Sequence, residues 1–316
     1  MNMLPVKRAF DVVKSSQVKW LVESLWTQQA VGLIVGQPKA GKSWLALDIA
    51  VSVASGTDVL DKFNVQNQGP VLVFPAEDEA SAVRDRLVGI CNFRGIDFKT
   101  LDVWLIESYA LHLDMKEDMD ALDNTLSKLK PRLLILDPLI RLHNVDENSA
   151  TEIAKVLSFL RKLQRKHSVA VLLVHHARKN ASGDPGLGLR GSTEIRAWAD
   201  SILYLRRNKS LELSVEHRAA PALEPFKLSL AINDESSVHL SIGESSVKDV
   251  KPDLKEQILE VLKKHCESSL SREFIRKEVG VRNQKVGDTL KVLEKGNCIV
   301  RTSQGYVLKN GSNCQF

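Results

Sequence analysis

Residues 36–43 constrain the fold of this chain more than any other stretch. They read Gly-Gln-Pro-Lys-Ala-Gly-Lys-Ser, which fits the phosphate-loop pattern of two glycines separated by four residues and followed by Lys and Ser. The apolar run 31–35 before them predicts a buried strand, and residues 44–54 after them have the apolar spacing of a helix. A turn that only joins a strand to a helix would not require Lys and Ser at these places. We therefore expect a phosphate-binding loop in an α/β fold.

The residue types of this loop suit a nucleotide phosphate. Backbone N–H groups of the loop and of the first helical turn can bind phosphate oxygens. The Lys42 ammonium adds a positive charge beside the β- and γ-phosphates, and the Ser43 hydroxyl suits Mg²⁺. The sequence therefore predicts ATP and Mg²⁺ as ligands. The predicted nucleotide contacts are Gly36, Gln37, Pro38, Lys39, Ala40, Gly41, Lys42, Ser43 and Trp44.

The composition is that of a soluble globular protein with room for one large and one small domain. Of 316 residues, 43% are hydrophobic and 26% charged. No apolar run is long enough to span a membrane, and no signal-peptide stretch follows Lys7 and Arg8. The cysteines are far apart without a CxxC pair, which favours free thiols in a cytoplasmic protein. They are Cys91, Cys266, Cys298 and Cys314.

The net charge of +5 is concentrated near the C-terminus. From residue 248 onward there are 14 Lys and Arg against 9 Asp and Glu, whereas residues 1–247 carry 30 of each sign. This excess favours an acidic partner such as nucleic acid, although a modest basic excess is also common on ordinary solvated surfaces.

Residues 1–29 form a polar lead-in that contains a small apolar group. The spacing of Trp20, Leu21, Val22, Leu25 and Trp26 fits a short helix over the start of the sheet. We interpret the two tryptophans as core cover rather than as a platform for adenine.

Apolar strands and helical patterns alternate through the middle of the chain. The runs 71–74, 133–136 and 169–174 are continuously apolar, and helical patterns cover 80–92 and 149–167. This pattern predicts a parallel sheet covered on both faces, with ligands at the carboxyl ends of its strands. A helix is expected at 191–199, capped by Ser192, and an antiparallel extension at 201–205, 211–215, 226–232 and 238–242.

Acidic residues follow two of the predicted parallel strands. Asp137 ends the run 133–136 and is expected to hold Mg²⁺. Because Pro138 follows it, a second acid that orients the attacking water has to come from elsewhere. Glu77, after the neighbouring strand, is the candidate general base. Glu79 is better explained as an acidic residue at a helix N-terminus.

The strand 169–174 runs into His175 and His176. Adjacent residues of a strand point to opposite faces, so only one of the two can face a nucleotide, and we favour His176 as a γ-phosphate sensor. An ordinary strand-end pair with one buried histidine is the alternative. A zinc site is not expected, since no third ligand is evident.

The segment that follows is rich in glycine and basic at its ends. Residues 179–190 are expected to form a mobile loop, and Arg178, Lys179 and Arg190 are candidate DNA contacts. A surface loop without a special role is an equal alternative. In the antiparallel extension, Arg206, Arg207 and Arg218 lie at strand ends, where one could act as an arginine finger toward a neighbouring subunit.

Several of these residues together resemble a known family. The phosphate loop, 75–78, 136–139 with Arg141 and His143, the histidine pair, and 190–192 are similar to the RepA-type RecA-like ATPases, the hexameric helicases of plasmids and their AAA-25 relatives. The resemblance covers roughly residues 20–235.

This resemblance implies a RecA fold and a six-membered ring with ATP between subunits. It also implies Glu77 as the catalytic glutamate and one histidine of the pair as a sensor. Family members carry a Lys-x-Arg pair on late strands. The matching place here reads Glu216-His217-Arg218, which leaves Arg218 as the finger candidate.

After a linker at 243–252, the tail resembles a winged helix. Helices are expected from Asp253 to about His265, from Ser271 to Gly280 and over 283–295, followed by a hairpin of 298–302 and 305–308. Side chains of the third helix suit base edges and phosphates, although a winged helix used for protein contacts or ring assembly is the alternative. The candidate DNA contacts here are Arg282, Asn283, Gln284, Lys285 and Lys291, with Arg301 and Lys309 on the wing.

The sequence thus predicts a lead-in at 1–29, an ATPase domain at 30–245 and a winged-helix domain at 253–310. The predicted function is that of a DNA-associated ATPase, most simply a RepA-type helicase of a mobile element that works as a ring. A nucleotide switch that does not translocate, such as a recombination mediator, is the first alternative. A regulator that binds only proteins is the second.

Overall fold

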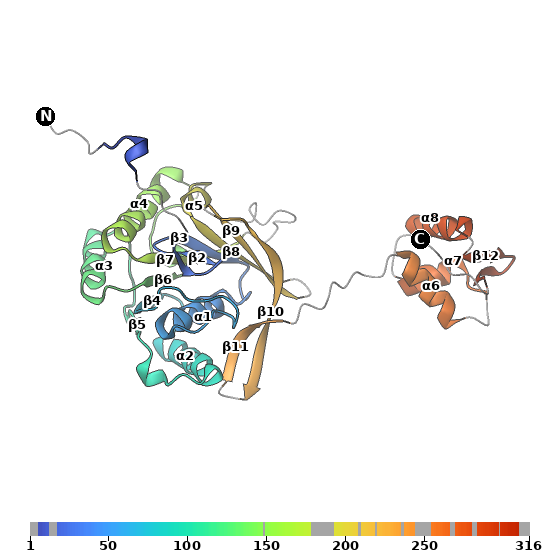
Figure 1. Cartoon of the computed structure of the whole chain (residues 1–316), viewed down its shortest axis with the longest axis horizontal. Coiled ribbons are helices and arrows are strands. Elements are labelled where there is room, and N and C mark those ends of the chain that lie inside the picture. Colours follow the sequence, from blue (N-terminus) through green and yellow to red (C-terminus); the bar gives the residue numbers. More distant parts are fainter. Residues whose placement is uncertain are drawn as a thin grey trace. The chain divides into compact units, whose positions relative to one another are not determined.

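The computed structural model divides the chain into two compact units, Met1–Glu244 and Ser245–Phe316. The buried apolar residues of the first unit form two clusters and those of the second unit form one. Figure 1 labels the helices and strands of both units. The structure describes residues 6–12, 18–147, 149–177, 193–207, 210–218, 220–234, 237–243, 254–265, 269–279, 283–296 and 298–309.

The first unit is built on a nine-stranded sheet with the order β11-β10-β9-β8-β3-β7-β6-β4-β5. All neighbours from β8 to β5 are parallel, whereas β8 to β11 pair antiparallel. The predicted α/β fold with a mostly parallel, RecA-like sheet is therefore confirmed. The strands are β3 (Val31–Gly36), β4 (Val71–Pro75), β5 (Val103–Leu105), β6 (Leu133–Asp137), β7 (Ala170–His176), β8 (Ser201–Arg207), β9 (Leu211–His217), β10 (Leu223–Asp234) and β11 (Ser237–Ile242).

The central strands contribute to two cores, one on each face of the sheet. In β3, Ile34 belongs to the core that contains α1 and α2, whereas Leu33 and Val35 belong to the core that contains α3 and α4. Strand side chains alternate between faces, so a strand buried on both faces reads as continuously apolar. Figure 1 shows these helix pairs on opposite sides of the sheet. The helices are α1 (Lys42–Ser55), α2 (Ala80–Arg94), α3 (Lys116–Leu129), α4 (Ala150–His167) and α5 (Thr193–Trp198), with the 3-10 turns η1 (Ala9–Asp11), η2 (Phe98–Thr100) and η3 (Leu139–Arg141).

The lead-in forms a hairpin, so the prediction of a short helix there is wrong. Strands β1 (Trp20–Val22) and β2 (Trp26–Thr27) pair antiparallel. Ser24 between them has a left-handed φ of 61°, which a continuing helix does not allow. The apolar side chains are nevertheless buried against the α1 face, so their spacing indicated burial and not helical periodicity. The buried residues are Leu21, Val22, Leu25 and Trp26.

The second unit is a small bundle of three helices closed by a hairpin. Its core contains side chains from all three helices and from β12, including Ile258, Ile275 and Leu290, and partly buried side chains of β13 pack against it. The Ser271 hydroxyl accepts a hydrogen bond from the backbone N–H of Phe274 at 3.2 Å, which is an N-terminal cap. The elements are α6 (Leu254–Lys264), α7 (Arg272–Val279), α8 (Asn283–Lys295), β12 (Ile299–Thr302) and β13 (Gly305–Leu308).

Two cysteines fall within the described residues. Cys91 and Cys298 are buried free thiols, whereas Cys266 and Cys314 lie outside the described part of the chain. Within that part, no helix is long and apolar enough to cross a bilayer.

Candidate functional site

The phosphate loop lines a cavity at the carboxyl ends of the parallel strands. The cavity has a volume of about 520 Å³ and receives residues from the loop and from the ends of β4, β6 and β7. The register places Pro75 beside Asp137, and Gly36 beside His176, so parallel pairing brings these positions to one edge of the sheet. The predicted loop contacts that line the cavity are Pro38, Lys39, Gly41, Lys42, Ser43 and Trp44. Gly36, Gln37 and Ala40 complete the loop outside this lining.

The two glycines of the loop meet different structural needs. Gly41 precedes α1 with a φ of 94°, a backbone region that other residues rarely adopt. At Gly36 a Cβ would lie 2.6 Å from the carbonyl oxygen of Leu205, because β8 packs closely there. The first glycine therefore allows the close approach of β8, and the second allows the turn into α1.

Lys42 is buried at the start of α1. Its ammonium donates a hydrogen bond to the carbonyl of Gln37 at 3.0 Å, which holds the side chain back across the loop. Burial lowers the pKa of Lys42, and the nearby carboxylates of Asp137 and Glu77 partly oppose this effect. A buried ammonium with few water contacts is prepared to bind an anion.

Asp137 and Ser43 lie together at the end of β6. Burial raises the pKa of Asp137 to about 6, opposed by a hydrogen bond from the Ser43 hydroxyl and by the charge of Lys42. Hydroxyl and carboxylate oxygens are donors that Mg²⁺ prefers, so this pair fits the expected metal. Among the described residues, no group of three or more His, Cys, Asp or Glu side chains could hold a metal ion. The remaining Mg²⁺ ligands would be phosphate and water oxygens.

Glu77 lines the same cavity and is paired with a cation. The Nε of Arg141, in η3, donates to its Oε1 at 2.9 Å, and both side chains are largely exposed. The Nε2 of His176 lies 4.0 Å from Oε2 of Glu77. Both oxygens of the carboxylate thus have a cationic or ionisable neighbour.

The two adjacent histidines have different surroundings. His176 is half-buried and lines the cavity, while His175 is 1% exposed. The Nδ1 of His175 lies 3.9 Å from Oε1 of Glu147, and the Nε2 of His143 lies 3.8 Å from the same oxygen. One histidine therefore faces the candidate site, and the other belongs to a buried polar group beneath it.

Five further residues line the cavity that had no predicted contact with a nucleotide bound by their own chain, and they are Pro75, Asp78, Arg86, Arg207 and Leu230. The Arg86 guanidinium, on α2, pairs with Asp78 and lies 5.8 Å from the ring of Trp44. Its only sequence signal was a basic residue two turns beyond an acidic loop. Arg207 and Leu230 reach the cavity from the antiparallel extension. Their places in the sequence did not indicate that they would lie there.

Arg218 lies at the opposite edge of the sheet from the cavity. It follows β9, and its guanidinium contacts Asp200 and the carbonyl of Ala197, next to the start of β8. The structure therefore brings Lys42, Asp137, Glu77 and His176 together, and does not bring Arg218 to them within one chain. A contact with a neighbouring subunit remains a prediction, as does any finger role for Arg206.

Most predicted DNA contacts cannot be placed. Arg178, Lys179, Arg190 and Arg282 lie outside the described residues, and only the backbone of Asn283, Gln284 and Lys285 is described, at the start of α8. Lys291 on α8 is exposed, as are Arg301 on β12 and Lys309 after β13. All of these assignments remain predictions.

Comparisons with known proteins agree with this fold. Residues 2–182 match the model of the AAA_25 family, an AAA domain. The chain is also similar to a solved structure described as "The Structure Of A DnaB-Like Replicative Helicase And Its Interactions With Primase". The TM-score is 0.51 at 17% identity, over 67% of this chain and 59% of that chain. The chain thus spans less than two thirds of that protein, and the likeness concerns the fold.

Proposed function

The chain belongs to the AAA_25 family, and we propose that it is an ATP-hydrolysing, DNA-associated ATPase, a RepA-type helicase or motor of a mobile element. The observation that supports this best is the arrangement of Lys42, Asp137 and Glu77 around one cavity behind the phosphate loop. A cation for the phosphates, an acid for Mg²⁺ and a second acid for water are the three groups that phosphoryl transfer to water requires.

In the proposed mechanism, each group acts on a different part of the nucleotide. Backbone N–H groups at the start of α1 and the Lys42 ammonium bind the phosphates. Ser43 and Asp137 would hold Mg²⁺, which would neutralise charge on the phosphates. Glu77 accepts a proton from the attacking water. We assign the role of γ-phosphate sensor to His176, whose Nε2 lies 4.0 Å from Oε2 of Glu77.

We propose that the chain assembles into a ring and that its C-terminal unit is a winged helix that binds DNA. Ring assembly, with six subunits by family resemblance, would let an arginine from one subunit reach the phosphates of the next, and Arg218 is the candidate. Arg207, by contrast, lines the cavity of its own chain. In the C-terminal unit, three helices and a hairpin form an arrangement suited to placing α8 in a groove of DNA.

One observation favours the alternative of a nucleotide switch that does not translocate. Glu77 is engaged by Arg141, so the candidate base is occupied in the free chain. A protein that hydrolyses ATP slowly and signals its nucleotide state to a partner would need such a restraint.

Steady-state ATP hydrolysis, with and without single-stranded DNA and over a range of protein concentrations, tests the proposal. We expect DNA to raise the rate several-fold and the rate per subunit to increase with concentration. The Glu77→Gln variant should lose about 10²–10⁴-fold, the usual contribution of a general base. Glu79→Gln makes the same change two residues further on, outside the cavity lining, and should hydrolyse normally.

A slow rate of ATP hydrolysis that does not change when DNA is added would exclude the helicase or motor, and would favour the nucleotide switch that does not translocate. Equal rates for Glu77→Gln and the unaltered chain would exclude Glu77 as the base.

A further inference from the structure

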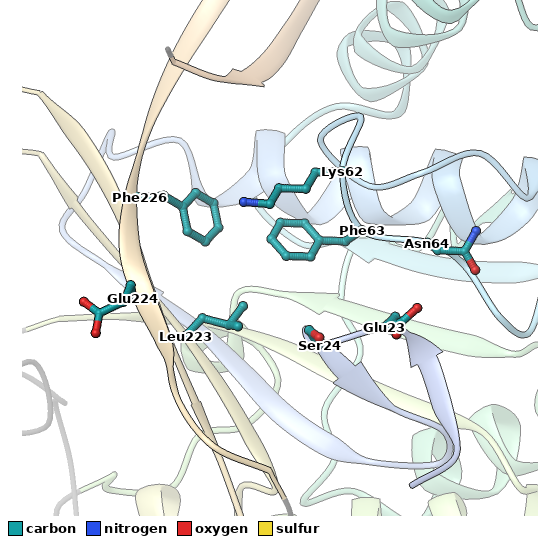
Figure 2. Close-up of a pocket in the computed structure, with 8 residues that line it drawn as sticks. All are labelled: Glu23, Ser24, Lys62, Phe63, Asn64, Leu223, Glu224 and Phe226. Carbon is teal, nitrogen blue, oxygen red and sulfur yellow. The ribbon is translucent and has the colours of Figure 1, made fainter. Parts of the chain in front are cut away.

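A second hollow, of about 410 Å³, lies away from the phosphate loop (Figure 2). Its residues come from the turn after β1, from the segment after α1, and from the start of β10. A cavity of about 150 Å³ is enough to hold benzene in a protein. The hollow can therefore accept an aromatic side chain together with its neighbours.

The walls of the hollow are aromatic. The rings of Phe63 and Phe226 lie 5.6 Å apart between centroids at an angle of 37°. Phe63 is only 6% exposed and forms the base of the hollow, whereas Phe226 is half-buried and keeps part of its ring accessible. Leu223 adds a third apolar group from β10, and the register shift between Leu223 and Phe226 allows both to face the hollow, although they are three residues apart. Figure 2 shows the two rings facing the same space.

Three charged residues line the hollow, namely Lys62 and the exposed acids Glu23 and Glu224. The Lys62 ammonium lies 5.5 Å from the centroids of both phenylalanine rings. Glu23, from the turn after β1, is exposed at the other side of the hollow and accepts a hydrogen bond from Gln66 at 3.2 Å. The hollow thus offers a cation, an apolar floor and an anion.

A segment of the lead-in has the complementary pattern. Phe10 in η1 is 94% exposed, and none of the residues of η1 is buried. Lys7 and Arg8 precede this ring, and Asp11 follows it, all of them exposed. An exposed phenylalanine flanked by opposite charges has the features of an interface anchor, because aromatic side chains supply much of the binding energy of protein interfaces.

We propose that this segment of one copy docks into the hollow of a second copy. Phe10 packs against Phe226 and Leu223 above the buried Phe63 ring, while Asp11 pairs with Lys62 and the basic residues 7 and 8 pair with Glu23. The two surfaces of this contact are different, so it is a head-to-tail contact that can be repeated from subunit to subunit. The inference rests on the proposed assembly, and it names the surface through which the chains associate.

The first test measures the mass of the full chain by sedimentation as a function of concentration. Phe10→Ala should weaken association by about tenfold or more, as expected when an aromatic anchor is truncated. Tyr109→Ala is the matched control, because Tyr109 is also a fully exposed aromatic residue but lies outside this pair of surfaces. Unchanged association of Phe10→Ala would overturn the proposal.

The second test separates docking between copies from docking within one chain. Phe10→Ala has an intact hollow, and Lys62→Glu has an intact aromatic anchor. Neither variant alone should assemble, whereas an equimolar mixture should form heterodimers through its one intact contact. A mixture that stays monomeric overturns the proposal.

The third test uses charge exchange. Asp11→Lys and Lys62→Glu should each reduce association, and the chain that carries both changes should recover most of it. If either change weakened association by disturbing the fold, the double variant would carry both defects and would associate no better than the single variants. Recovered association therefore excludes a folding defect as the cause. If the double variant is as weak as the single ones, the pairing is wrong.

ATP binding, followed with a fluorescent nucleotide in all these variants, distinguishes this inference from the proposed function. Normal binding with lost assembly supports the docking contact. Normal assembly in every variant, with any level of binding, rejects this contact and leaves the proposed ATPase untouched.

Discussion

At the scale of single residues, two charged groups of the candidate site, Lys42 and Glu77, are each held by a partner within the chain. Lys42 is held by the Gln37 carbonyl, whereas Glu77 is held by the exposed Arg141. An exposed ion pair contributes only about 0.2–1 kcal/mol. Such a restraint is weak enough for a charged ligand such as a DNA phosphate to replace.

Arg141→Ala should raise the basal rate of ATP hydrolysis by up to about fivefold, the factor that corresponds to about 1 kcal/mol. The reason is that Glu77 is released to accept a proton from water. Steady-state hydrolysis without DNA measures this effect. Arg84→Ala, which removes an exposed arginine paired with Asp85 on α2, serves as the control. A lower basal rate would show instead that Arg141 holds Glu77 in its working orientation.

His217 should make the stability of the first unit sensitive to pH. Its Nε2 donates to the Ser24 carbonyl at 2.8 Å, which fastens the lead-in hairpin to β9. Burial lowers its pKa below 6.5, and the bond to Ser24 partly opposes this shift. The unfolded chain therefore takes up a proton at a higher pH than the folded chain, so this contribution to stability is present above pH 6.5 and lost as pH falls through the folded pKa.

Urea unfolding of the unaltered chain and of His217→Gln at pH 7.5 and pH 5.5 measures this effect. The stability difference between the two proteins should shrink at the lower pH. A difference that stays constant would mean that His217 is not the titrating group.

At the scale of secondary-structure elements, a buried ion pair joins α1 to α2. Arg94 Nη2 lies 2.6 Å from Asp48 Oδ1, with side chains 4% and 0% exposed. Asp48 also accepts from the backbone N–H of Leu60 at 3.0 Å, and Arg94 donates to Thr57 at 3.0 Å. Burial raises the pKa of Asp48 to about 6, although Arg94 opposes this. The pair therefore ties both helices to the segment after α1.

Asp48→Asn should destabilise the first unit by about 3–5 kcal/mol, because it leaves the Arg94 guanidinium buried without its partner charge. Urea unfolding at neutral pH is the measurement. Replacing both residues, as in Asp48→Leu with Arg94→Met, should recover most of the loss, since paired apolar replacements of buried ion pairs are often neutral. A loss below about 1 kcal/mol for the single variant would show that water reaches Arg94.

The sequence predicted the elements whose signal is local. The phosphate loop, the continuously apolar strands and the acids that follow them were all evident, because a buried parallel strand leaves a plain apolar run. The strand Trp20–Val22 was wrongly predicted to be part of a helix. The turn that follows it depends on the left-handed backbone of Ser24, which the pattern of apolar residues does not indicate. Helix α3 and strand β5 were not predicted, because α3 buries only Leu122 and Leu126 and its pattern is mostly polar.

The remaining site residues depend on tertiary contacts. Arg86 and Arg207 reach the cavity only because α2 and β8 pack where they do. Arg141 approaches Glu77 across 64 positions of sequence. The spacing of residues along the chain does not indicate which distant residues will form pairs. The structure of a single chain likewise does not indicate which residues a neighbouring subunit would supply.

At the scale of the whole molecule, the chain is two units with separate cores and different charge. The basic excess from residue 248 onward belongs entirely to the second unit. Nucleotide chemistry and the proposed DNA contacts can therefore be tested apart.

Residues 245–316 should bind duplex DNA by themselves, with an affinity that falls as salt increases, because phosphate contacts release counterions. Lys291→Ala should weaken binding and reduce the slope of log K against log salt by about 1, as expected for one lost phosphate contact. Lys263→Ala on α6 removes an equally exposed lysine from another helix and should leave the slope unchanged. Fluorescence anisotropy measures both, and salt-independent binding would favour the protein-binding alternative.

Strand β10 has a consequence for communication within the first unit. Leu223 and Phe226 near its start line the aromatic hollow, and Leu230 further along lines the nucleotide cavity. The seven residue steps from Leu223 to Leu230 span about 23 Å, so a single strand connects the two places. Over this span β10 pairs with β9 as far as Leu228 and with β11 from Leu228 onward, and a register shift interrupts the pairing with β9 between Leu223 and Phe226. A displacement at the start of β10 can therefore reach the wall of the cavity beside the phosphate loop through one continuous backbone.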